Sequence, residues 1–401
     1  MSGRKSKIMK NILIITSSNL PIPPVKGGAV QNLIYFYLLN NEINHKFNFT
    51  VTSIYNEKAV IETEKRKFKN TKFVYISNSN SLEKIQHSGI KGVSGLIYKY
   101  RKKHHIKEIE KIFGNINDKF DMILYENVPE YTCSFSNFNG KKILHLHNDS
   151  VNIDTFDSYD NFEKNVDGII AVSEYISRRV KQVYKKPVYT VYNAISLKKP
   201  NSERIKHIKQ IYDIKDSDLV FIFTGRIVEE KGIHIFLQAL ANFEPSNIKV
   251  LLVGGKGYGD DIKDEYYYKL KSIVSNISDQ VIFTGYVDYS NMIDYLMCAD
   301  VGFLLSIIPE ALPMTAIEYI SMGIPVIGTK MGGITEVIDE TCGFLIDNDE
   351  HAVENCEEII KKIINNKNEL SLKKVAAQKK SKLFSMDSYN ENMLKIMSDF
   401  T

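Results

Sequence analysis

The chain is most informative at residues Pro309–Gly333, which read PEALPMTAIEYISMGIPVIGTKMGG. Before this stretch comes an apolar run typical of a buried strand, DVGFLLS, and within it comes a second, PVIGT. Between the two runs, apolar residues recur at helical spacing from Met314 to Met322, and Gly323 ends the pattern. The succession of strand, helix and strand predicts an α/β unit with a parallel sheet.

Two carboxylates bracket the start of this helix. Glu310 lies in the entry loop, and Glu318 lies about one turn inside the helix. Both can point towards a ligand over the helix start, where free backbone N–H groups can face an anion. A carboxylate beside a phosphate is repulsive unless it accepts hydrogen bonds from hydroxyl groups, so a sugar ring and a ribose are the fitting partners. The alternative is that both glutamates are merely solvated. The pattern favours one half of a binding site, the half that would hold an anion attached to a sugar.

Strand and helix patterns alternate along the whole chain. The strand-like runs are KNILIITSS, NFTVTSIY, KFVYIS, DMILYE, KKILHLHND and GIIAVSE, then LVFIFTGR, KVLLVGG, VIFTGY, VGFLLS, PVIGT and GFLID. This rhythm predicts two doubly wound sheets, whose ligands bind outside the carboxyl ends of the strands. The charged stretch 195–216 is interpreted as a linker, which gives domains 1–195 and 196–385. The remaining residues, 386–401, are predicted to form a helix that crosses back to the first domain.

Composition indicates a globular protein of two or three domains. The chain has 401 residues, of which 43% are hydrophobic and 25% are charged. Its apolar runs fall short of the ~20 residues of a membrane helix. The cysteines have no CxxC or CxxH spacing, so we expect reduced thiols in a cytoplasmic protein, with neither a zinc site nor disulfides. They are Cys133, Cys298, Cys342 and Cys356.

Charge is distributed unevenly between the two halves. Residues 1–200 carry an excess of 13 positive charges, and residues 201–401 an excess of 9 negative charges. The densest basic segment, Lys99–Phe113, has a helical pattern with Ile106, Ile109 and Ile112 on a common side. Such a helix suits an anionic membrane surface, or it is a solvated helix with a narrow core stripe. Nucleic-acid binding is disfavoured because no stacking or groove-reading motif accompanies the charge.

Two cations follow the first strand of the second half. Arg226 comes directly after the strand FIFTG, and Lys231 stands at the start of the next helix, GIHIFLQAL. Cations beside a helix N-terminus suit a diphosphate. The alternative is a solvated turn in which both cations pair with Glu229 and Glu230.

The first half has its own candidate residues at strand ends. Gly27 and Gly28 follow the first strand and allow a ligand to approach the backbone closely. Neither GxGxxG nor GxxxxGK[ST] occurs there, which disfavours a dinucleotide dehydrogenase and a P-loop enzyme. His145 and His147 alternate onto one strand face, with His147 nearer the carboxyl end. A histidine in such a strand can equally be structural.

Together these motifs resemble the retaining GT-B glycosyltransferases of the family 4 group, also called glycosyl transferases group 1. The markers are KGGAV, HLHND, NVDGIIAVSEYI, VYNAIS, GRIVEEKGIHIFLQA, LLVGG, VIFTGYV and the E-x7-E segment with its sequel. Their order spans nearly the whole chain. The resemblance implies an α/β fold of two Rossmann-like doubly wound domains that face each other across a cleft. It also implies sugar transfer from a nucleotide diphosphate sugar, expected to be a UDP-sugar, without a metal or another cofactor.

The resemblance assigns a role to each site residue. Arg226 and Lys231 would hold the diphosphate and stabilise the charge of the leaving group. Glu310 would accept hydrogen bonds from the donor sugar, and Glu318 from the ribose. The backbone N–H groups of Met314 and Thr315 would contact phosphate. Gly285 and Val287 would lie beside the base. Gly27, Gly28 and His147 would complete the reaction centre.

The chain departs from the family at two places. Pro313 stands where the family has glycine, and VYNAIS replaces the usual Gly-Ile-Asp ending at the hinge. The expected acceptor is a lipid-linked or surface polysaccharide at the inner face of the cell membrane. Two alternatives are a GT-B enzyme that elongates soluble glucan or epimerises a sugar nucleotide, and a spore-coat-like protein with a structural role.

Overall fold

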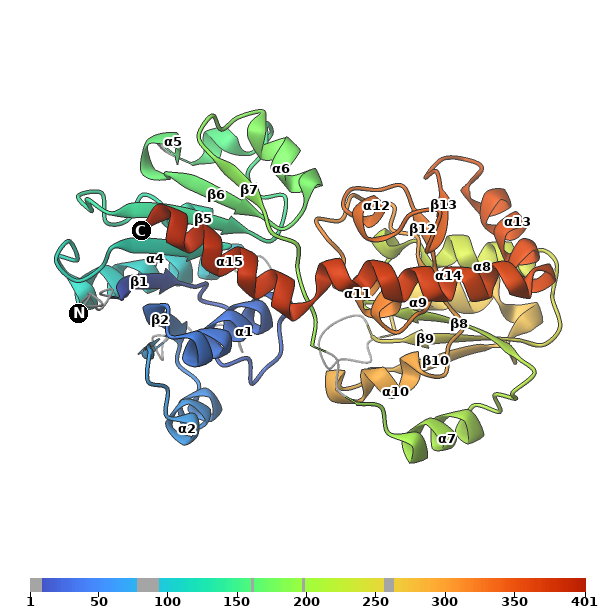
Figure 1. Cartoon of the computed structure of the whole chain (residues 1–401). Coiled ribbons are helices and arrows are strands. Elements are labelled where there is room, and N and C mark those ends of the chain that lie inside the picture. The colour runs from blue at the N-terminus through green and yellow to red at the C-terminus, as the bar shows by residue number, and fades with distance from the viewer. Residues whose placement is uncertain (1–8, 78–93, 160–161, 197–198, 256–262) are drawn as a thin grey trace, which may run out of the picture. The chain divides into compact units, whose positions relative to one another are not determined.

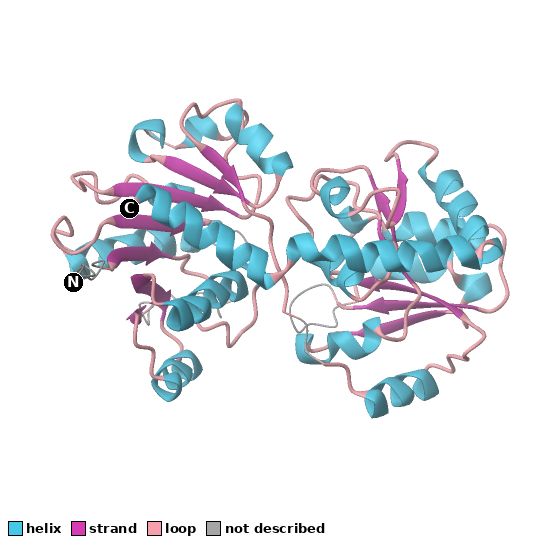
Figure 2. Ribbon diagram, in the orientation of Figure 1, coloured by secondary structure: helices cyan, strands magenta, loops and turns pink. Residues whose placement is uncertain are grey.

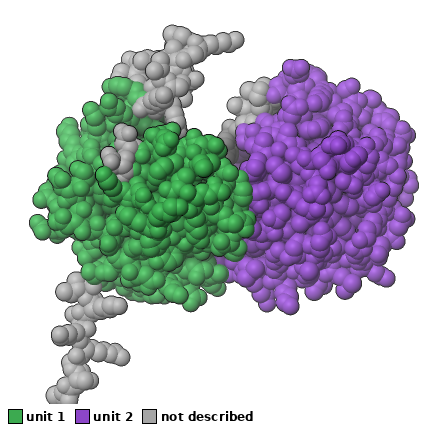
Figure 3. Space-filling model, turned by 90° about the horizontal axis from the view of Figure 1, so that it is seen from above, with its two compact units in different colours: residues 1–193, 386–401 green, residues 194–385 purple. Residues whose placement is uncertain are grey.

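The computed structural model describes residues 9–77, 94–159, 162–196, 199–255 and 263–401. Contacts between residues divide the chain into two compact units. The first unit comprises residues 1–193 and 386–401, and the second unit comprises residues 194–385 (Figure 3). Each unit is a parallel β-sheet covered by helices (Figure 2).

The described part of the first unit contains a sheet of seven parallel strands in the order β3-β2-β1-β4-β5-β6-β7. The strands are β1 (Lys10–Ile15), β2 (Phe47–Ile54), β3 (Thr71–Ile76), β4 (Met122–Glu126), β5 (Lys141–Leu146), β6 (Gly168–Ala171) and β7 (Val188–Thr190). The helices are α1 (Ala29–Asn44), α2 (Glu57–Arg66), α4 (Ser94–Phe113), α5 (Phe162–Asn165), α6 (Glu174–Lys181) and α15 (Met386–Phe400), with short 3-10 turns η1 (Pro129–Tyr131) and η2 (Phe156–Ser158).

The last helix of the chain packs on the first unit. α15, red in Figure 1, lies beside α1. The ring of Phe400 at its end contacts the ring of Tyr189, with centroids 5.7 Å apart. A Cβ atom added to Gly168 would lie 2.5 Å from that ring, so the glycine makes room for it. Burial of aromatic surface therefore anchors α15 to the strands β6 and β7.

In the second unit, the described strands form a six-stranded parallel sheet in the order β10-β9-β8-β11-β12-β13. The strands are β8 (Leu219–Thr224), β9 (Ile248–Val253), β10 (Val281–Gly285), β11 (Val301–Leu304), β12 (Val326–Thr329) and β13 (Gly343–Ile346). The α-helices are α7 (Ser202–Ile211), α8 (Ile233–Ala241), α9 (Glu265–Ile273), α10 (Met292–Leu296), α11 (Met314–Ser321), α12 (Ile334–Val337), α13 (Ala352–Asn365) and α14 (Lys367–Lys380). Single 3-10 turns are η3 (Glu229–Lys231), η4 (Ser275–Ile277), η5 (Tyr289–Asn291) and η6 (Ser381–Phe384).

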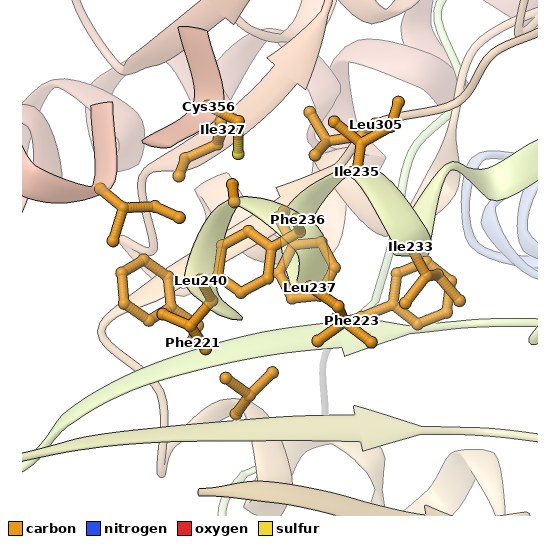
Figure 4. Packing of buried hydrophobic residues seen from close by; sticks show 14 of the residues in the cluster. Phe221, Phe223, Ile233, Ile235, Phe236, Leu237, Leu240, Leu305, Ile327 and Cys356 are labelled. Carbon is orange, nitrogen blue, oxygen red and sulfur yellow. The ribbon is translucent and has the colours of Figure 1, made fainter. Parts of the chain in front are cut away.

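Successive residues of β11 face opposite layers of helices. The ring of Phe303 stacks on Phe236 of α8, with centroids 4.0 Å apart and planes at 5°. Phe236 belongs to the buried hydrophobic cluster of this unit (Figure 4). Gly302, the neighbour of Phe303, faces Tyr319 of α11, because an added Cβ atom would lie 2.5 Å from that ring. The alternation of side chains along a strand thus places α8 and α11 on opposite faces of the sheet.

The two sheets share one topology. Each order reverses beside its first strand, between β1 and β4 and between β8 and β11. Ligands of doubly wound sheets bind at such a switch point, outside the carboxyl ends of the strands. The predicted α/β class and the predicted strands are confirmed, whereas β7, a short strand of intermediate burial, was not foreseen.

The stretch 195–216, expected to be a linker, instead contains the helix α7. The side chain of Asn201 caps this helix by accepting hydrogen bonds from the N–H groups of Glu203 and Arg204. Arg204 pairs with the buried Asp294 of α10 at 3.0 Å, which ties the helix to the second unit. The charged composition therefore reflects the exposed side of a docked helix.

We predict that Tyr319→Phe destabilises the second unit by about 1–3 kcal/mol. The buried hydroxyl of Tyr319 accepts a hydrogen bond from the N–H group of Thr224 at 2.7 Å, and its loss leaves that group unsatisfied. Urea denaturation measures the change. Tyr268→Phe is the control, because Tyr268 is 61% exposed. Equal unfolding midpoints for the two variants would contradict the assigned hydrogen bond.

Candidate functional site

A cavity of about 340 Å³ opens in the second unit at the carboxyl ends of β8, β9 and β11. Thr224, Val253 and Leu304 at these strand ends line it. The predicted site residues that also line it are Arg226, Lys231, Val287, Glu310, Met314, Thr315 and Glu318. Residues far apart in the sequence thus meet at the switch point of the sheet.

Three glycines lie at neighbouring strand ends, and Gly225 and Gly254 among them form the floor of the cavity, whereas the predicted residue Gly285 does not line it. Gly225, Gly254 and Gly285 have φ values of 138°, 145° and 72°, which side chains rarely adopt. The N–H group of Gly254 donates to the carbonyl of Gly285 at 3.0 Å. A Cβ atom on Gly254 would lie 1.9 Å from the carbonyl oxygen of Gly225. Without side chains, the backbone leaves this edge of the sheet open to a ligand. In the sequence, the strand endings FTG, LVGG and FTG indicate these glycines.

The turn that carries Lys231 packs against the end of β11. Gly232, which follows it, has φ 62°, and an added Cβ atom would lie 1.8 Å from the carbonyl oxygen of Leu305. The N–H group of Ile307 also donates to the carbonyl of Glu230 at 3.0 Å. These backbone contacts place the ammonium group of Lys231 against the carboxylate of Glu310, with which it forms an ion pair.

The side chains of Arg226 and Lys231 differ in how exposed they are to solvent. The guanidinium group of Arg226 is about half exposed and pairs with Glu230 at 2.7 Å. Lys231 and Glu310 are only 20% and 18% exposed. An exposed pair with Glu230 contributes little, so Arg226 can turn to a ligand at small cost.

A glycine pair and a serine hold Glu310. The N–H group of Gly333 donates to the carbonyl of Glu310 at 2.7 Å, and a Cβ atom on Gly332 would lie 2.3 Å from that oxygen. The hydroxyl of Ser306 donates to Oε1 of Glu310 at 2.7 Å. Ser306 is a site residue that the sequence analysis missed, although it interrupts the apolar run VGFLLSII.

The start of α11 faces the same cavity. Pro313 is its N-cap, with φ −72° and ψ 118°, and the carbonyl of Pro313 accepts from the N–H group of Ile317. The N–H groups of Met314 and Thr315 therefore need partners from outside the helix. At this position proline gives up no helical hydrogen bond, so its replacement of the family glycine leaves the helix start intact.

Glu318 is a buried carboxyl group, 7% exposed. Burial raises its pKa to about 7, and a hydrogen bond with the hydroxyl of Tyr289 opposes this rise. Tyr289 and Tyr286 also line the cavity, and these residues are 54% and 46% exposed. Tyr289 was not among the predicted residues, because its turn, η5, carries no pattern that links it to Glu318.

The first unit gathers a second set of polar residues at the carboxyl ends of β4 and β5. Nε2 of His147 lies 3.0 Å from Oε2 of Glu126, and Nδ1 of His145 lies 3.1 Å from the same oxygen. The hydroxyl of Tyr37 donates to Oε1 of Glu126 at 2.9 Å. Glu126 is also a missed residue, although it is a charged residue at the end of the apolar run DMILYE.

The pKa values of Glu126 and His147 are determined by burial and by the contacts within this cluster. Burial alone would raise the pKa of Glu126, but His145 and His147 hold it at about 2. Burial and His145 lower the pKa of His147 to about 4. At neutral pH, the cluster therefore contains an ionised Glu126 and a neutral His147.

Glu126, His145 and His147 are the described residues whose ligand atoms converge enough for a metal, within 4.8 Å of one another. A metal-bound histidine almost always donates its second ring N–H group to a partner. Nε2 of His145 and Nδ1 of His147 have no hydrogen-bond partner in the described part of the chain. The donor set therefore fits a hydrogen-bonded carboxylate better than a metal ion.

Gly27 and Gly28 precede α1 in the first unit. Their φ values of 75° and 106° lie in the region that favours glycine. Among the described residues, no heavy atom lies within 4 Å of a Cβ atom built on Gly27. Gly27, Gly28 and His147 belong to the first unit, so their meeting with the cavity of the second unit stays a prediction.

Comparison with known proteins identifies the second unit. Residues 204–382 match the family model described as glycosyl transferases group 1. The second unit is a group 1 glycosyl transferase domain. This match spans nearly all of residues 194–385 and confirms the resemblance inferred from the motifs.

Relatives and solved structures match more of the chain than this family model does. Spore coat protein SA of Bacillus subtilis is 23% identical over 96% of this chain and 98% of its own length. Lipopolysaccharide 1,2-N-acetylglucosaminetransferase of Salmonella typhimurium is 26% identical over 84% of this chain and 85% of its own. Anabaena Alr3699/HepE, crystallised in complex with UDP, has a TM-score of 0.73 at 17% identity, covering 98% of this chain and 100% of its own. The fold is GT-B, with two Rossmann-like doubly wound domains.

We predict that Glu318→Gln removes a pH-dependent loss of stability. Between its ordinary value of 4.5 and about 7, the carboxyl is ionised in the unfolded chain but held neutral in the fold. The folded chain thus loses stability as pH rises through this window, by about 3 kcal/mol. Denaturant unfolding at pH 4 and pH 8 should show Glu318→Gln gaining that amount over the parent protein.

The exposed Glu340→Gln change removes one carboxyl elsewhere and controls for net charge. Parallel pH profiles for the parent protein and Glu318→Gln would contradict the burial of an unfavourable charge at Glu318.

Proposed function

We propose that this protein is a retaining hexosyl- or N-acetylhexosaminyltransferase that uses a UDP-sugar and a lipid-linked or surface-polysaccharide acceptor. One observation carries the proposal. A single cavity contains two cations, a helix start with backbone N–H groups to offer, and two carboxylates. The cations and N–H groups suit a diphosphate, and the carboxylates suit the hydroxyls of the two sugars that flank it.

The contacts of Lys231 and Glu310 allow a ligand to bind without breaking their ion pair. An ammonium group has three N–H donors, so Lys231 can hold Glu310 and a phosphate oxygen together. Glu310 accepts from Lys231 and Ser306, which leaves acceptor capacity on its carboxylate for hydroxyls of a donor sugar. Ser306 and Lys231 thus fix the direction of this carboxylate.

The proposed transfer forms one bond at the anomeric carbon, breaks another there and moves one proton. The acceptor hydroxyl oxygen bonds to the anomeric carbon while the bond from that carbon to the diphosphate breaks. The proton of the hydroxyl passes to a phosphate oxygen of the departing UDP, on the same face, which retains the configuration. Arg226 and Lys231 stabilise the charge of the leaving group, so the proposal requires no divalent metal at this step.

The relatives support the choice of donor and acceptor. The Anabaena protein was crystallised in complex with UDP. The Salmonella relative is a lipopolysaccharide N-acetylglucosaminetransferase. Tyr286 and Val287 line the end of the cavity where a base would lie beside the glycine floor. The match to Spore coat protein SA over nearly the whole chain keeps a structural role as the second candidate.

We predict that Lys231→Ala weakens UDP binding by about 2–4 kcal/mol, because a charged partner of the diphosphate is lost. Isothermal calorimetry with UDP, GDP, ADP and CMP, in the presence of a metal chelator, measures affinity and base preference. Lys269→Ala is the matched control. Lys269 pairs with Glu229 of the same turn and does not line the cavity.

Glu310→Gln should retain UDP binding and reduce transfer, because Glu310 is assigned to the sugar.

In the calorimetry, equal binding of UDP by the parent protein and by Lys231→Ala would remove Lys231 from the site. Failure of all four nucleotides to bind would favour the structural role.

The helix α4 supports a peripheral membrane contact. Lys103, Lys107 and Lys111 are exposed and follow one another at four-residue spacing, which places them on one face. His105 and Ile109 are buried on the opposite side. Of the isoleucines expected on the buried side, Ile112 is 51% exposed, because it lies in the last turn of the helix. None of the described helices is long and apolar enough to span a bilayer.

We predict that changing Lys103, Lys107 and Lys111 to Gln lowers affinity for phosphatidylserine vesicles by about 1 kcal/mol per residue. Vesicle flotation at low salt gives the bound fraction. The exposed residues Lys361, Lys362 and Lys367, changed to Gln together, remove the same charge from the second unit as a control. A similar bound fraction for both variants would show that α4 is a solvated helix without a membrane role.

A further inference from the structure

The carboxylate of Glu126 is an unusual feature at the end of β4, because it is buried and its ion-pair contacts among the described residues are with histidines. Its residue is 1% exposed. A buried charge is strongly unfavourable unless hydrogen bonds satisfy it. Tyr37 satisfies one oxygen at 2.9 Å, and His147 satisfies the other at 3.0 Å. The first unit therefore maintains this charge by hydrogen bonds from two different elements, α1 and the end of β5.

The two histidines contact Glu126 differently. Nε2 of His147 makes a hydrogen bond to Oε2 of Glu126. Nδ1 of His145 lies 3.1 Å from that oxygen but is not aligned for a hydrogen bond. Their rings are in contact, with centroids 4.0 Å apart. Glu126 thus orients His147 directly, while His145 packs against it.

We propose that Glu126 is a positioning residue, which fixes His147 in the tautomer that is protonated on Nε2 and leaves Nδ1 as a hydrogen-bond acceptor for a substrate hydroxyl. An ionised carboxylate can only accept hydrogen bonds, so the ring nitrogen that faces it must carry a proton. A neutral imidazole has one ring proton, so Nδ1 then carries a lone pair. The role of His147 at the reaction centre rests on the proposed function.

The surroundings maintain this arrangement of protons. The groups that face the carboxylate are Tyr37 from α1, His145 and His147 from β5 and its end, and Tyr389 from α15. Burial raises the pKa of Tyr37 and Tyr389 well above their ordinary values, so both hydroxyls stay neutral. The low pKa of Glu126 and of His147 keeps the first ionised and the second neutral near pH 7.

Nδ1 of His147 is the acceptor that remains free. This atom is buried, and it has no hydrogen-bond partner among the described residues. A buried acceptor without a partner is unfavourable, which points to a group that completes it. His147 directly follows β5 at the carboxyl edge of the sheet, where ligands of this topology bind. A neutral acceptor at this place suits a sugar hydroxyl and does not suit a phosphate oxygen.

The test is a long-range ¹H–¹⁵N NMR spectrum of the full chain with ¹⁵N-labelled histidine, near pH 7. His145→Asn and His147→Asn assign the two rings. The shifts of the ring nitrogens should show a proton on Nε2 of His147 and none on Nδ1. A proton on Nδ1 would overturn the proposal without any further variant, and this measurement needs neither substrate nor activity.

Glu126→Gln supplies the functional arm, because glutamine can donate as well as accept and no longer dictates the tautomer. We expect a shift of His147 towards the other tautomer and a fall in kcat on the order of 10- to 100-fold, the range typical when a partner that orients a histidine is lost. UDP affinity should be unchanged. Glu126→Asp, which keeps the charge, should recover part of the turnover.

Tyr37→Phe is the matched control, because it removes the other hydrogen bond to the same carboxylate. It should lower stability as Glu126→Gln does, but leave the tautomer of His147 unchanged. An unchanged tautomer and kcat in Glu126→Gln would overturn the proposal. So would removal of the Nε2 proton by added Zn²⁺, since the cluster would then be a metal site. If the parent protein does not bind UDP, that result contradicts the proposed function. It leaves the tautomer of His147 to be decided by the NMR spectrum.

Discussion

Close contact between backbones at the carboxyl edge of the second sheet is the constraint on which the site depends. Gly232 lies against the carbonyl of Leu305, and Gly332 lies against the carbonyl of Glu310, at distances that admit no Cβ atom. These contacts bring the turn of Lys231 and the loop of Glu310 together over the strand ends. Charged side chains can then meet at fixed positions, because the segments that carry them cannot separate without losing packed backbone.

The two buried glutamates show how partners decide the state of the same side chain. Glu318 has the hydroxyl of Tyr289 beside it, and burial raises its pKa to about 7. Glu126 is buried at least as deeply, but two histidines hold its pKa at about 2. One unit of the protein therefore contains a carboxyl that can be neutral near pH 7, and the other contains a carboxylate that stays charged. Desolvation acts on both, and the electrostatic interactions and hydrogen bonds with neighbouring side chains determine the outcome.

Much of the site in the second unit was predictable because its residues follow strands in recognisable patterns. Lys231, Glu310 and Glu318 stand at junctions of strand, turn and helix, and parallel strands place such junctions at one edge. Tyr289 and Glu126 were not predicted, because each contacts a partner distant in the sequence. Ser306 was not predicted either, although its partner Glu310 is only four residues away. The helix α7 was mistaken for a linker, since a docked helix with a broad exposed face has the composition of a loop.

The sequence by itself determined the α/β class, the order of strands and helices, and the group 1 resemblance. These follow from local periodicity, from glycines at strand ends and from motif order, all of which are properties of neighbouring residues. Only the tertiary structure decided the ion pair of Lys231 with Glu310, the burial of Glu318 and the partners of Glu126. Hydrogen bonding and desolvation depend on which atoms meet in space, and residues 79 positions apart meet only when the chain is folded.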